Sequence, residues 1–158
     1  MAPPHGGAIQ NEFLFFAVGN MGLKIWDVSD PLNPVERGKF VDLSVFETFV
    51  DIDVTGNNVY VACQDRLRVI DISDPDLPKA PAGGTQGICL ENSDKIVVYE
   101  NTAYVLGSGS LKVIDISNSE TPVLSNSIPM TEVPEDLLIS SGMICAWNAK
   151  TVTFFDIT

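Results

Sequence analysis

The stretch "LKVIDISNSETPV", residues 111–123, decides the fold because the chain repeats it. The same pattern occurs 44 residues earlier as "LRVIDISDPDLPK" and another 44 residues earlier as "LKIWDVSDPLNPV". A shorter fourth copy, "VTFFDIT", stands at the end of the printed sequence. Self-similarity at a fixed period of roughly 20–50 residues is typical of proteins built from stacked structural repeats.

Each repeat predicts two strands joined by a tight polar turn. We anchor the units on the aspartate that ends each second strand: Asp27, Asp71, Asp115 and Asp156. The twelve residues before each aspartate then align without gaps, which matches Phe15 with Val59. An apolar run, a turn such as "GNMG" or "GSGS" and an alternating apolar and polar run form a hairpin signature. We expect one more strand before each hairpin. A short outer strand should follow it, weakest in "KAPAGGTQG", where proline tolerates only an edge position.

Four antiparallel strands in each unit of about 43 residues are typical of a β-propeller blade. We therefore expect an all-β fold in which residues 1–158 form one β-propeller domain or part of one. The predicted blades cover approximately residues 5–43, 44–85, 86–130 and 131–158, and the last blade lacks its outer strand. A β-sandwich of hairpins is the alternative, but it would not require periodic spacing.

The charge and the cysteines exclude several classes of function. A formal charge of −12 repels phosphate backbones and anionic lipids, so we expect neither nucleic-acid nor membrane-surface binding. The longest apolar run, "FLFFAV", is too short to span a bilayer, so we expect no membrane insertion. The first ten residues contain neither a basic nor an apolar segment, so no signal peptide is visible. Cys63, Cys89 and Cys145 have no zinc-type spacing, and the chain has one histidine. Three thiols are expected, with one disulfide as the alternative.

The repeated phrases, each preceded by an apolar run such as "VYVACQ" or "AYVLGS", resemble the LVIVD repeat. The resemblance covers nearly the whole chain and implies propeller blades. It also implies a bacterial or archaeal protein, often extracellular or at the cell surface, that acts as a binding or scaffolding module without an assigned reaction. The fourth unit departs from the pattern, because it keeps the aspartate but lacks the proline-containing turn that follows in the other three.

The repeated "D-x-S-D" pattern has two interpretations. Carboxylates at this spacing can share a hard cation. Alternatively, the aspartate and serine side chains cap turn amides before the proline, forming Asx and ST turns. A motif present in successive blades normally serves the blade, so we favour the structural interpretation.

A second candidate site lies where the inner strands begin, near the predicted channel mouth. Two adjacent rows of aligned positions there carry four carboxylates: Asp94 and Glu135 in the first row, and Asp51 and Asp136 in the second. His5 is expected nearby, with Asp42 and Glu47 in a preceding loop. Converging carboxylates could hold Ca²⁺ or bind a cationic or hydroxylated ligand such as a carbohydrate. The alternative is a solvated acidic rim.

The unfinished fourth blade predicts an assembly edge. Val152, Phe154 and Phe155 would lie on an uncovered strand, and natural proteins avoid leaving such edges bare. The chain could close alone, associate with a second copy into a homo-oligomer, or belong to a longer chain. We therefore expect a non-enzymatic binding or scaffolding module with a protein partner. The alternative is a carbohydrate-active or other hydrolytic enzyme that uses carboxylates at the channel mouth.

Overall fold

The computed structural model describes residues 5–44, 47–81 and 87–157, and all regular structure within them is β-strand. The strands form four antiparallel sheets, which confirms the all-β expectation. The first sheet contains β1 (Gly6–Gln10), β2 (Phe13–Ala17), β3 (Leu23–Asp27) and β4 (Val35–Phe40). The second contains β5 (Phe49–Thr55), β6 (Asn58–Cys63), β7 (Arg66–Asp71) and β8 (Ile88–Cys89). The third contains β9 (Ser93–Tyr99), β10 (Thr102–Gly107), β11 (Ser110–Asp115) and β12 (Val123–Pro129), and the fourth contains β13 (Asp136–Ser140), β14 (Met143–Trp147) and β15 (Val152–Asp156).

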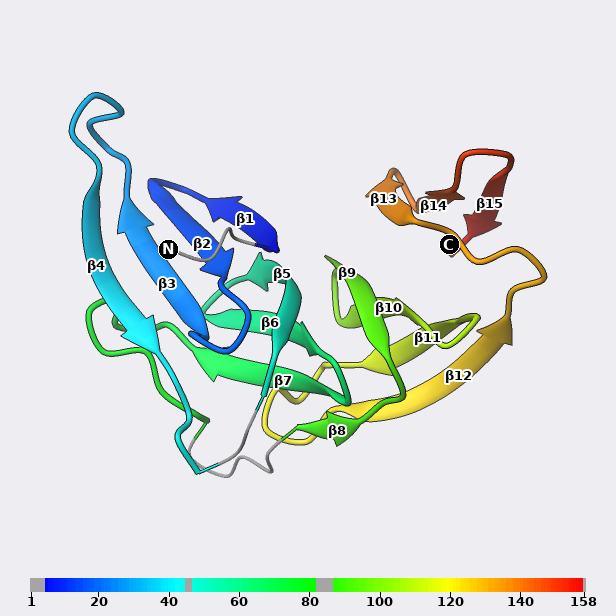
Figure 1. Ribbon diagram of the computed structural model, residues 1–158, viewed down its shortest axis with the longest axis horizontal. Coiled ribbons are helices and arrows are strands. Elements are labelled where there is room, and N and C mark those ends of the chain that lie inside the picture. The colour runs from blue at the N-terminus through cyan, green and yellow to red at the C-terminus, as the bar shows by residue number, and fades with distance from the viewer. Residues whose placement is uncertain (1–4, 45–46, 82–86, 158) are drawn as a thin grey trace.

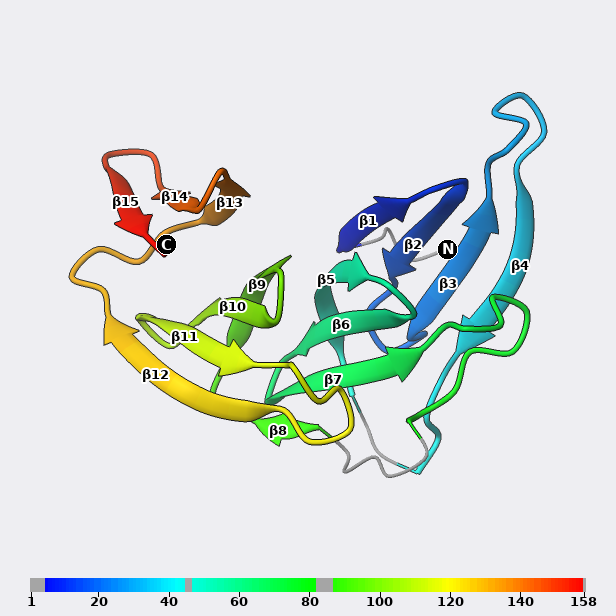
Figure 2. The ribbon, with the colours of Figure 1, turned by 180° about the vertical axis from the view of Figure 1, so that it is seen from behind.

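The four sheets follow one another along an arc (Figure 1). The first strand of each sheet, namely β1, β5, β9 or β13, lies on the inner side of the arc, and the later strands lie progressively outward. The view from behind shows the same order (Figure 2). The first and fourth sheets form the two ends of the arc and do not face each other. This arrangement is β-propeller-like, and the described part of it is open.

Three hydrophobic clusters join neighbouring sheets. Because each inner sheet is covered on both faces, its central strands are apolar at nearly every position, as in "NVYVAC" of β6, of which five of the six residues are buried. Val59 and Val61 of β6 pack toward the first sheet, whereas Tyr60 and Ala62 pack toward the third. The third cluster joins the third and fourth sheets through residues such as Leu111 and Ile144.

The repeated aspartates cap turns. The carboxylates of Asp27, Asp71 and Asp115 each accept a hydrogen bond from the amide of the serine two residues later, at 3.0, 2.8 and 2.8 Å. These contacts lower the pKa of each carboxyl, chiefly through the backbone hydrogen bond. The structural interpretation of the "D-x-S-D" pattern is therefore confirmed. The same turns join neighbouring sheets, since Arg37 of the first sheet binds Asp76 at 2.8 Å.

The first hairpin differs from the ungapped sequence alignment by one residue. Phe15 pairs with Ile25, whereas Val59, which the alignment matched with Phe15, pairs with Ile70. As a result, Phe15 packs toward the second sheet, while Val59 packs toward the first. The cause is the longer turn after β2, in which Gly19 and Gly22 adopt positive φ angles of 54° and 76° and accommodate the additional residues.

The outer strand of the second sheet lies later in the chain than expected. Lys79 forms a bridge with Asp71, and the strand itself, β8, pairs with Arg66 and Leu67 of β7. The sequence-based limits assigned β8 to the third blade. Pro81 has no amide donor for a strand ladder, and among the described residues the ladder to β7 comprises Ile88 and Cys89. Residues 82–86 lie outside the described part of the chain.

Candidate functional site at the inner strands

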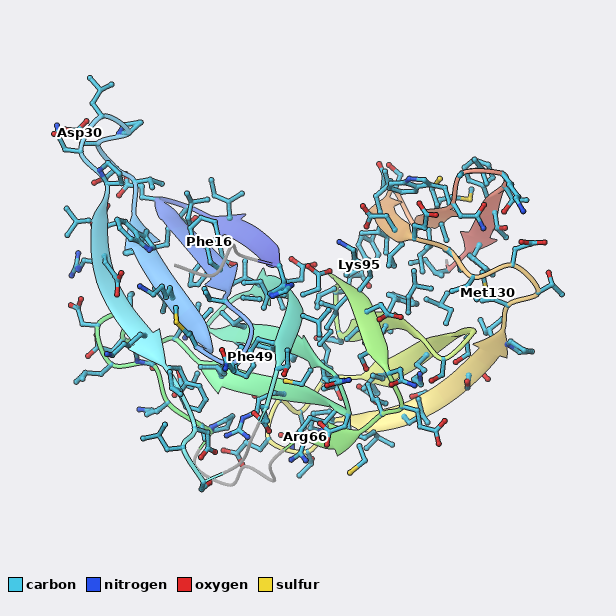
Figure 3. All side chains as sticks on the ribbon, in the orientation of Figure 1. Phe16, Asp30, Phe49, Arg66, Lys95 and Met130 are labelled. Atoms are coloured by element: carbon cyan, nitrogen blue, oxygen red, sulfur yellow. The ribbon has the colours of Figure 1, made fainter. Side chains whose placement is uncertain are left out.

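An open hollow of about 590 Å³ lies on the inner side of the arc, along the first strands of the four sheets. Figure 3 shows Lys95 at the end of β9 that borders this region. The charged and titratable side chains among its lining residues are His5, Asp51, Asp53, Lys95 and Asp136. The hollow is therefore a mixed polar site with both signs of charge.

Asp51 is buried, with 8% of the residue exposed. One oxygen of its carboxylate, Oδ2, accepts a hydrogen bond from the Ile96 amide of β9 at 3.1 Å. The first sheet approaches closely here, because a Cβ added to Gly6 would lie 2.7 Å from the Asp51 Cα. Burial raises the pKa of Asp51, and the hydrogen bond from Ile96 and the charge of Lys95 oppose this rise.

Asp53 repeats this contact one step along the same strand. Its Oδ2 accepts a hydrogen bond from the Val98 amide at 2.7 Å, and burial raises the pKa of Asp53. Alternate residues of β5 therefore cap alternate amides at the inner edge of β9. The two aspartates join the second and third sheets, which is a structural role that the sequence-based interpretation did not assign to Asp51.

The structure brings together only two of the four predicted rim carboxylates. Asp51 and Asp136 both line the hollow, and a carboxylate oxygen of Asp136 lies 3.8 Å from the Lys95 Nζ. Asp94 is exposed and does not line it, because the pairing register of β9 shifts between Ser93 and Lys95 and leaves Asp94 at the irregularity. Glu135 is also exposed and precedes β13.

The calcium hypothesis gains no support from the described residues. They contain no group of three or more histidine, cysteine, aspartate or glutamate side chains arranged to hold a metal ion. Hard cations such as Ca²⁺ take six to eight oxygen ligands, whereas Asp51 and Asp53 already accept backbone hydrogen bonds.

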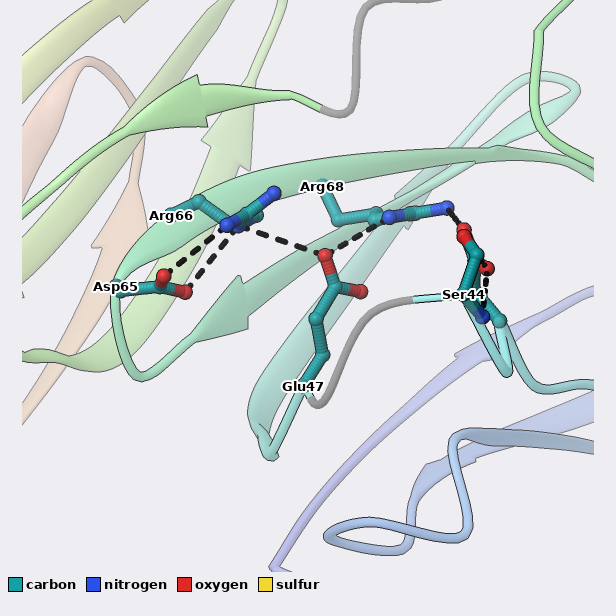
Figure 4. Close-up of polar contacts among 6 residues, drawn as sticks. Ser44, Glu47, Asp65, Arg66 and Arg68 are labelled. Carbon is teal, nitrogen blue, oxygen red and sulfur yellow. Dashed lines mark hydrogen bonds and ion pairs between the residues drawn. The ribbon is translucent and has the colours of Figure 1, made fainter.

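A second polar cluster lies beside the connection from the first to the second sheet (Figure 4). The guanidinium of Arg68 binds Glu47 at 2.8 Å and also binds Asp42. Both the Arg68 and the Glu47 side chains are 4% exposed. Arg66 lies 3.4 Å from the same Glu47 oxygen and pairs with Asp65 at 3.1 Å. The cluster thus attaches residues 42 and 47, which belong to this connection, to β7.

The two carboxyl groups of this cluster differ in environment. Burial raises the pKa of Glu47, although Arg68 opposes the rise. Hydrogen bonds from Ser44, followed by the contact with Arg68, lower the pKa of Asp42 to about 2. A cavity of about 350 Å³ borders both residues and extends to Asn20 and Phe49. The cluster holds this connection against β7, and the opposite charges of its buried side chains neutralise one another.

The sequence places Asp42 and Glu47 in a loop before the second inner strand but predicts no partner for either carboxylate. The signal was the basic residue that recurs at one repeat position, as Lys24, Arg68 and Lys112. Lys112 has a related role, since its ammonium donates to the carbonyl of Glu91 at 3.1 Å in the connection between the second and third sheets. The recurring cation is therefore an attachment point for the preceding connection in the second and third sheets, whereas Lys24 binds Glu36 of β4 in its own sheet.

All three cysteines are free thiols, as expected. Cys63 is buried, Cys145 is half-buried and Cys89 is exposed. Burial strongly raises the pKa of the Cys63 thiol, which makes it a poor nucleophile.

We predict that Asp51→Asn raises the melting temperature at neutral pH. An acid whose pKa is higher in the folded state than in the unfolded state loses stability as the pH rises through that interval. The amide keeps an acceptor oxygen for Ile96 but removes the buried charge. Melting curves of the variant and the parent, recorded between acid and neutral pH, should therefore converge at low pH and diverge at neutral pH.

The matched control for Asp51→Asn is Asp94→Asn, which alters an exposed carboxylate in the adjacent inner strand. Its melting temperature should follow that of the parent at every pH. If Asp51→Asn melted below the parent at neutral pH, the ionised carboxylate would be contributing more through Lys95 and Ile96 than it loses through burial.

These features define a repeat-built, β-propeller-like protein. A family model described as the LVIVD repeat matches residues 8–42, 49–79 and 92–129, and the chain belongs to this family. No curated protein matches the sequence. The described residues contain no helix long and apolar enough to span a membrane.

Solved structures of low sequence identity share the fold. A protein of unknown function from Desulfotomaculum acetoxidans matches with a TM-score of 0.74 and 16% identity, over 99% of this chain and 52% of its own. Apo AztD from Citrobacter koseri matches with a TM-score of 0.63 and 17% identity, and the match covers 98% of this chain and 43% of AztD. The computationally designed protein Ika4 matches with a TM-score of 0.61 and 12% identity, over 100% and 93%. The chain thus spans about half the length of the two natural proteins.

Proposed function

We propose that the protein is a non-enzymatic binding and scaffolding module, that each sheet is one blade of a β-propeller, and that the module assembles through its fourth sheet. Membership of the LVIVD-repeat family supports a module of this kind. A location outside the cell or at its surface, and a protein partner, belong to the same proposal. The acidic charge of −12 favours partners that are neutral or basic.

The observation that carries the proposal is the outward face of the fourth sheet. We call it the C-terminal face, and it consists of Leu138, Cys145, Trp147, Val152 and Phe154. Leu138, Val152 and Phe154 are 47%, 57% and 64% exposed. Contiguous exposed apolar residues on a sheet are typical of an interaction site. Phe155, which the sequence had placed with them, is only half-exposed and packs against the third sheet.

A hydrolytic enzyme is the second candidate, and one observation favours it. Asp51 has a raised pKa and lines the same open hollow as Asp136, whose charge contributes to the rise. A carboxyl group with a raised pKa in the same site as a second carboxylate is an arrangement that glycoside hydrolases use. Incubation with a panel of nitrophenyl glycosides tests this function. Turnover that Asp51→Asn abolishes would establish it and overturn the non-enzymatic proposal.

We predict that the parent chain self-associates and that Phe154→Lys shifts it to the monomer. A lysine on the C-terminal face would have to be desolvated on association, whereas Phe154 is exposed in the single chain and its replacement leaves the core intact. Sedimentation equilibrium of both proteins measures the difference. Leu77→Lys is the matched control, because Leu77 is 70% exposed in the turn after β7 of the second sheet and away from the C-terminal face.

Two outcomes would contradict assembly through the C-terminal face. The parent could sediment as a monomer at all concentrations, or Phe154→Lys could associate as strongly as Leu77→Lys. Unchanged melting of the dilute variants would confirm that neither substitution unfolds the chain.

A further inference from the structure

We infer that the partner of the C-terminal face is the opposite end of a second copy of this chain, so that two arcs close head to tail into one ring. The inference rests on the proposed self-association and adds a specific occupant and geometry. It predicts two identical junctions, each formed by the C-terminal face of one copy and the first sheet of the other. The contacts that the chain makes between its own sheets support it.

The C-terminal face carries the repeat positions that are buried inside the arc. Tyr60, Ala62, Leu67 and Val69 of the second sheet pack toward the third, and Tyr104, Leu106, Leu111 and Val113 of the third pack toward the fourth. In the fourth sheet the same positions are occupied by Cys145, Trp147, Val152 and Phe154. Their cross-strand pairing is also the same, since Tyr60 lies opposite Val69 and Cys145 lies opposite Phe154. The fourth sheet therefore presents the surface that receives a following sheet.

The first sheet presents the complementary surface. Val59, Val61 and Ile70 of the second sheet pack backward onto the first. Their structural equivalents in the first sheet are Leu14, Phe16 and Trp26, which with Ile9 we call the N-terminal face. Ile9 is 65% exposed, and the other three are half-exposed. In Figure 3, Phe16 is labelled on this end of the arc.

Both faces carry large apolar side chains at positions where the internal sheets have smaller ones. On the C-terminal face, Trp147 replaces an alanine or leucine and Phe154 replaces valines, whereas Cys145 replaces tyrosines. On the N-terminal face, Trp26 is larger than the isoleucines at its position, and Phe16 is larger than the valines. Association of the two faces would therefore bury a large apolar area.

The same repeat equivalence predicts a polar contact between the two copies at their inner strands. Asp136 occupies the position of Asp51, because Asp136 pairs with Trp147 as Asp51 pairs with Ala62. The Asp51 carboxylate accepts a hydrogen bond from the Ile96 amide of the following sheet. The amide equivalent to that of Ile96 is Gly7, since Gly7 lies opposite Phe16 and Ile96 lies opposite Val105. In the ring, Asp136 of one copy would therefore accept a hydrogen bond from Gly7 of the other.

The shape of the chain agrees with a ring of two copies. The sheets follow an arc with the N-terminal and C-terminal faces at opposite ends (Figure 1). The accessible surface is 8475 Å², compared with about 7,800 Å² expected for a folded monomer of 17.1 kDa. The arc also superposes on 52% and 43% of two larger chains of the same fold.

The test compares the 158-residue parent with Phe154→Lys and Ile9→Lys, one substitution for each end. Sedimentation should give twice the 17.1 kDa mass for the parent and a monomer for both variants. A head-to-tail junction uses both faces, whereas association of two C-terminal faces does not involve Ile9. If Ile9→Lys stayed dimeric while Phe154→Lys became monomeric, ring closure would be wrong and self-association through the fourth sheet would stand.

Cysteine alkylation gives an independent readout within one sample. Cys145 lies on the C-terminal face, so N-ethylmaleimide should modify it in the monomeric variants and much more slowly in the parent at high protein concentration. Cys89, which is exposed, and Cys63, which is buried, serve as the reactive and unreactive controls. A monomeric parent with reactive Cys145 would overturn both ring closure and self-association, and would leave further sheets of a longer chain as the occupant.

Discussion

Arg68→Met should lower the free energy of unfolding by about 3 kcal/mol, because it leaves the buried Glu47 carboxylate without its main partner. For a chain of this size the melting temperature should fall by roughly 10 °C. Glu47 would then ionise less readily in the folded protein, so the deficit should shrink as the pH falls from neutral toward about 5. Urea denaturation at several pH values measures both effects.

A second substitution tests whether this loss of stability arises from the pair of Arg68 and Glu47. Glu47→Met in the Arg68→Met background removes the unpaired charge, so the double variant should be more stable than Arg68→Met alone. Arg37→Met is the matched control. Arg37 also pairs with two carboxylates, at 2.8 Å to Asp76 and 3.1 Å to Asp27, but all three groups are solvent-accessible. Its loss should change stability little. Equal losses for Arg68→Met and Arg37→Met would show that burial does not determine the contribution.

The sequence predicted the architecture well because the repeat encodes it directly. A buried sheet must be apolar on both faces, and the turns between strands require aspartate, proline and glycine at fixed positions. Both requirements recur at the same spacing, so three copies of one pattern predict three similar sheets. The errors lie where a turn changes length. The additional residues between Ala17 and Leu23 shift the first hairpin by one residue, and an ungapped comparison cannot detect this because "FLFFA" is apolar in either register.

The candidate site was harder to predict because its residues meet through tertiary contacts. Asp51 and Asp136 occupy equivalent repeat positions, which is why the sequence identified both. Asp94 was placed beside them because the alignment could not anticipate the irregular pairing at the start of β9. Arg68 and Glu47 are 21 residues apart, and no local pattern links them. The basic residue at this repeat position predicts an ion pair only once the structure shows which connection lies next to it.

The repeat also explains why the surfaces at the two ends of the arc are apolar. Evolution of a repeat protein normally replaces apolar residues on a terminal face with polar ones, because terminal repeats need a soluble cap. Here the fourth sheet keeps Trp147 and Phe154, and the first keeps Phe16 and Trp26. Both ends therefore retain the composition of internal sheets. Sheets of this composition need a cover, which a second copy or further sheets of a longer chain can supply.

Leu67→Ala and Val152→Ala test this symmetry with one kind of substitution at one repeat position. Leu67 is fully buried between the second and third sheets, and its truncation should cost about 3 kcal/mol at any protein concentration. Val152 is 57% exposed in the single chain, so its truncation should cost less than about 0.5 kcal/mol in dilute solution. In a closed ring Val152 would be buried as Leu67 is. Its truncation should then weaken association and lower the melting temperature only at high concentration.

Thermal unfolding over a wide concentration range separates these effects. The curves for Leu67→Ala and the parent should run parallel, with the variant lower throughout, because the loss lies within one copy. The curves for Val152→Ala and the parent should coincide at low concentration and separate as association begins. If Val152→Ala matched the parent at every concentration while the parent still associated, Val152 would lie outside the contact. The C-terminal face would then have to engage through Leu138 and the inner strand instead, with Asp136 rather than the β15 side chains determining how the second copy is oriented.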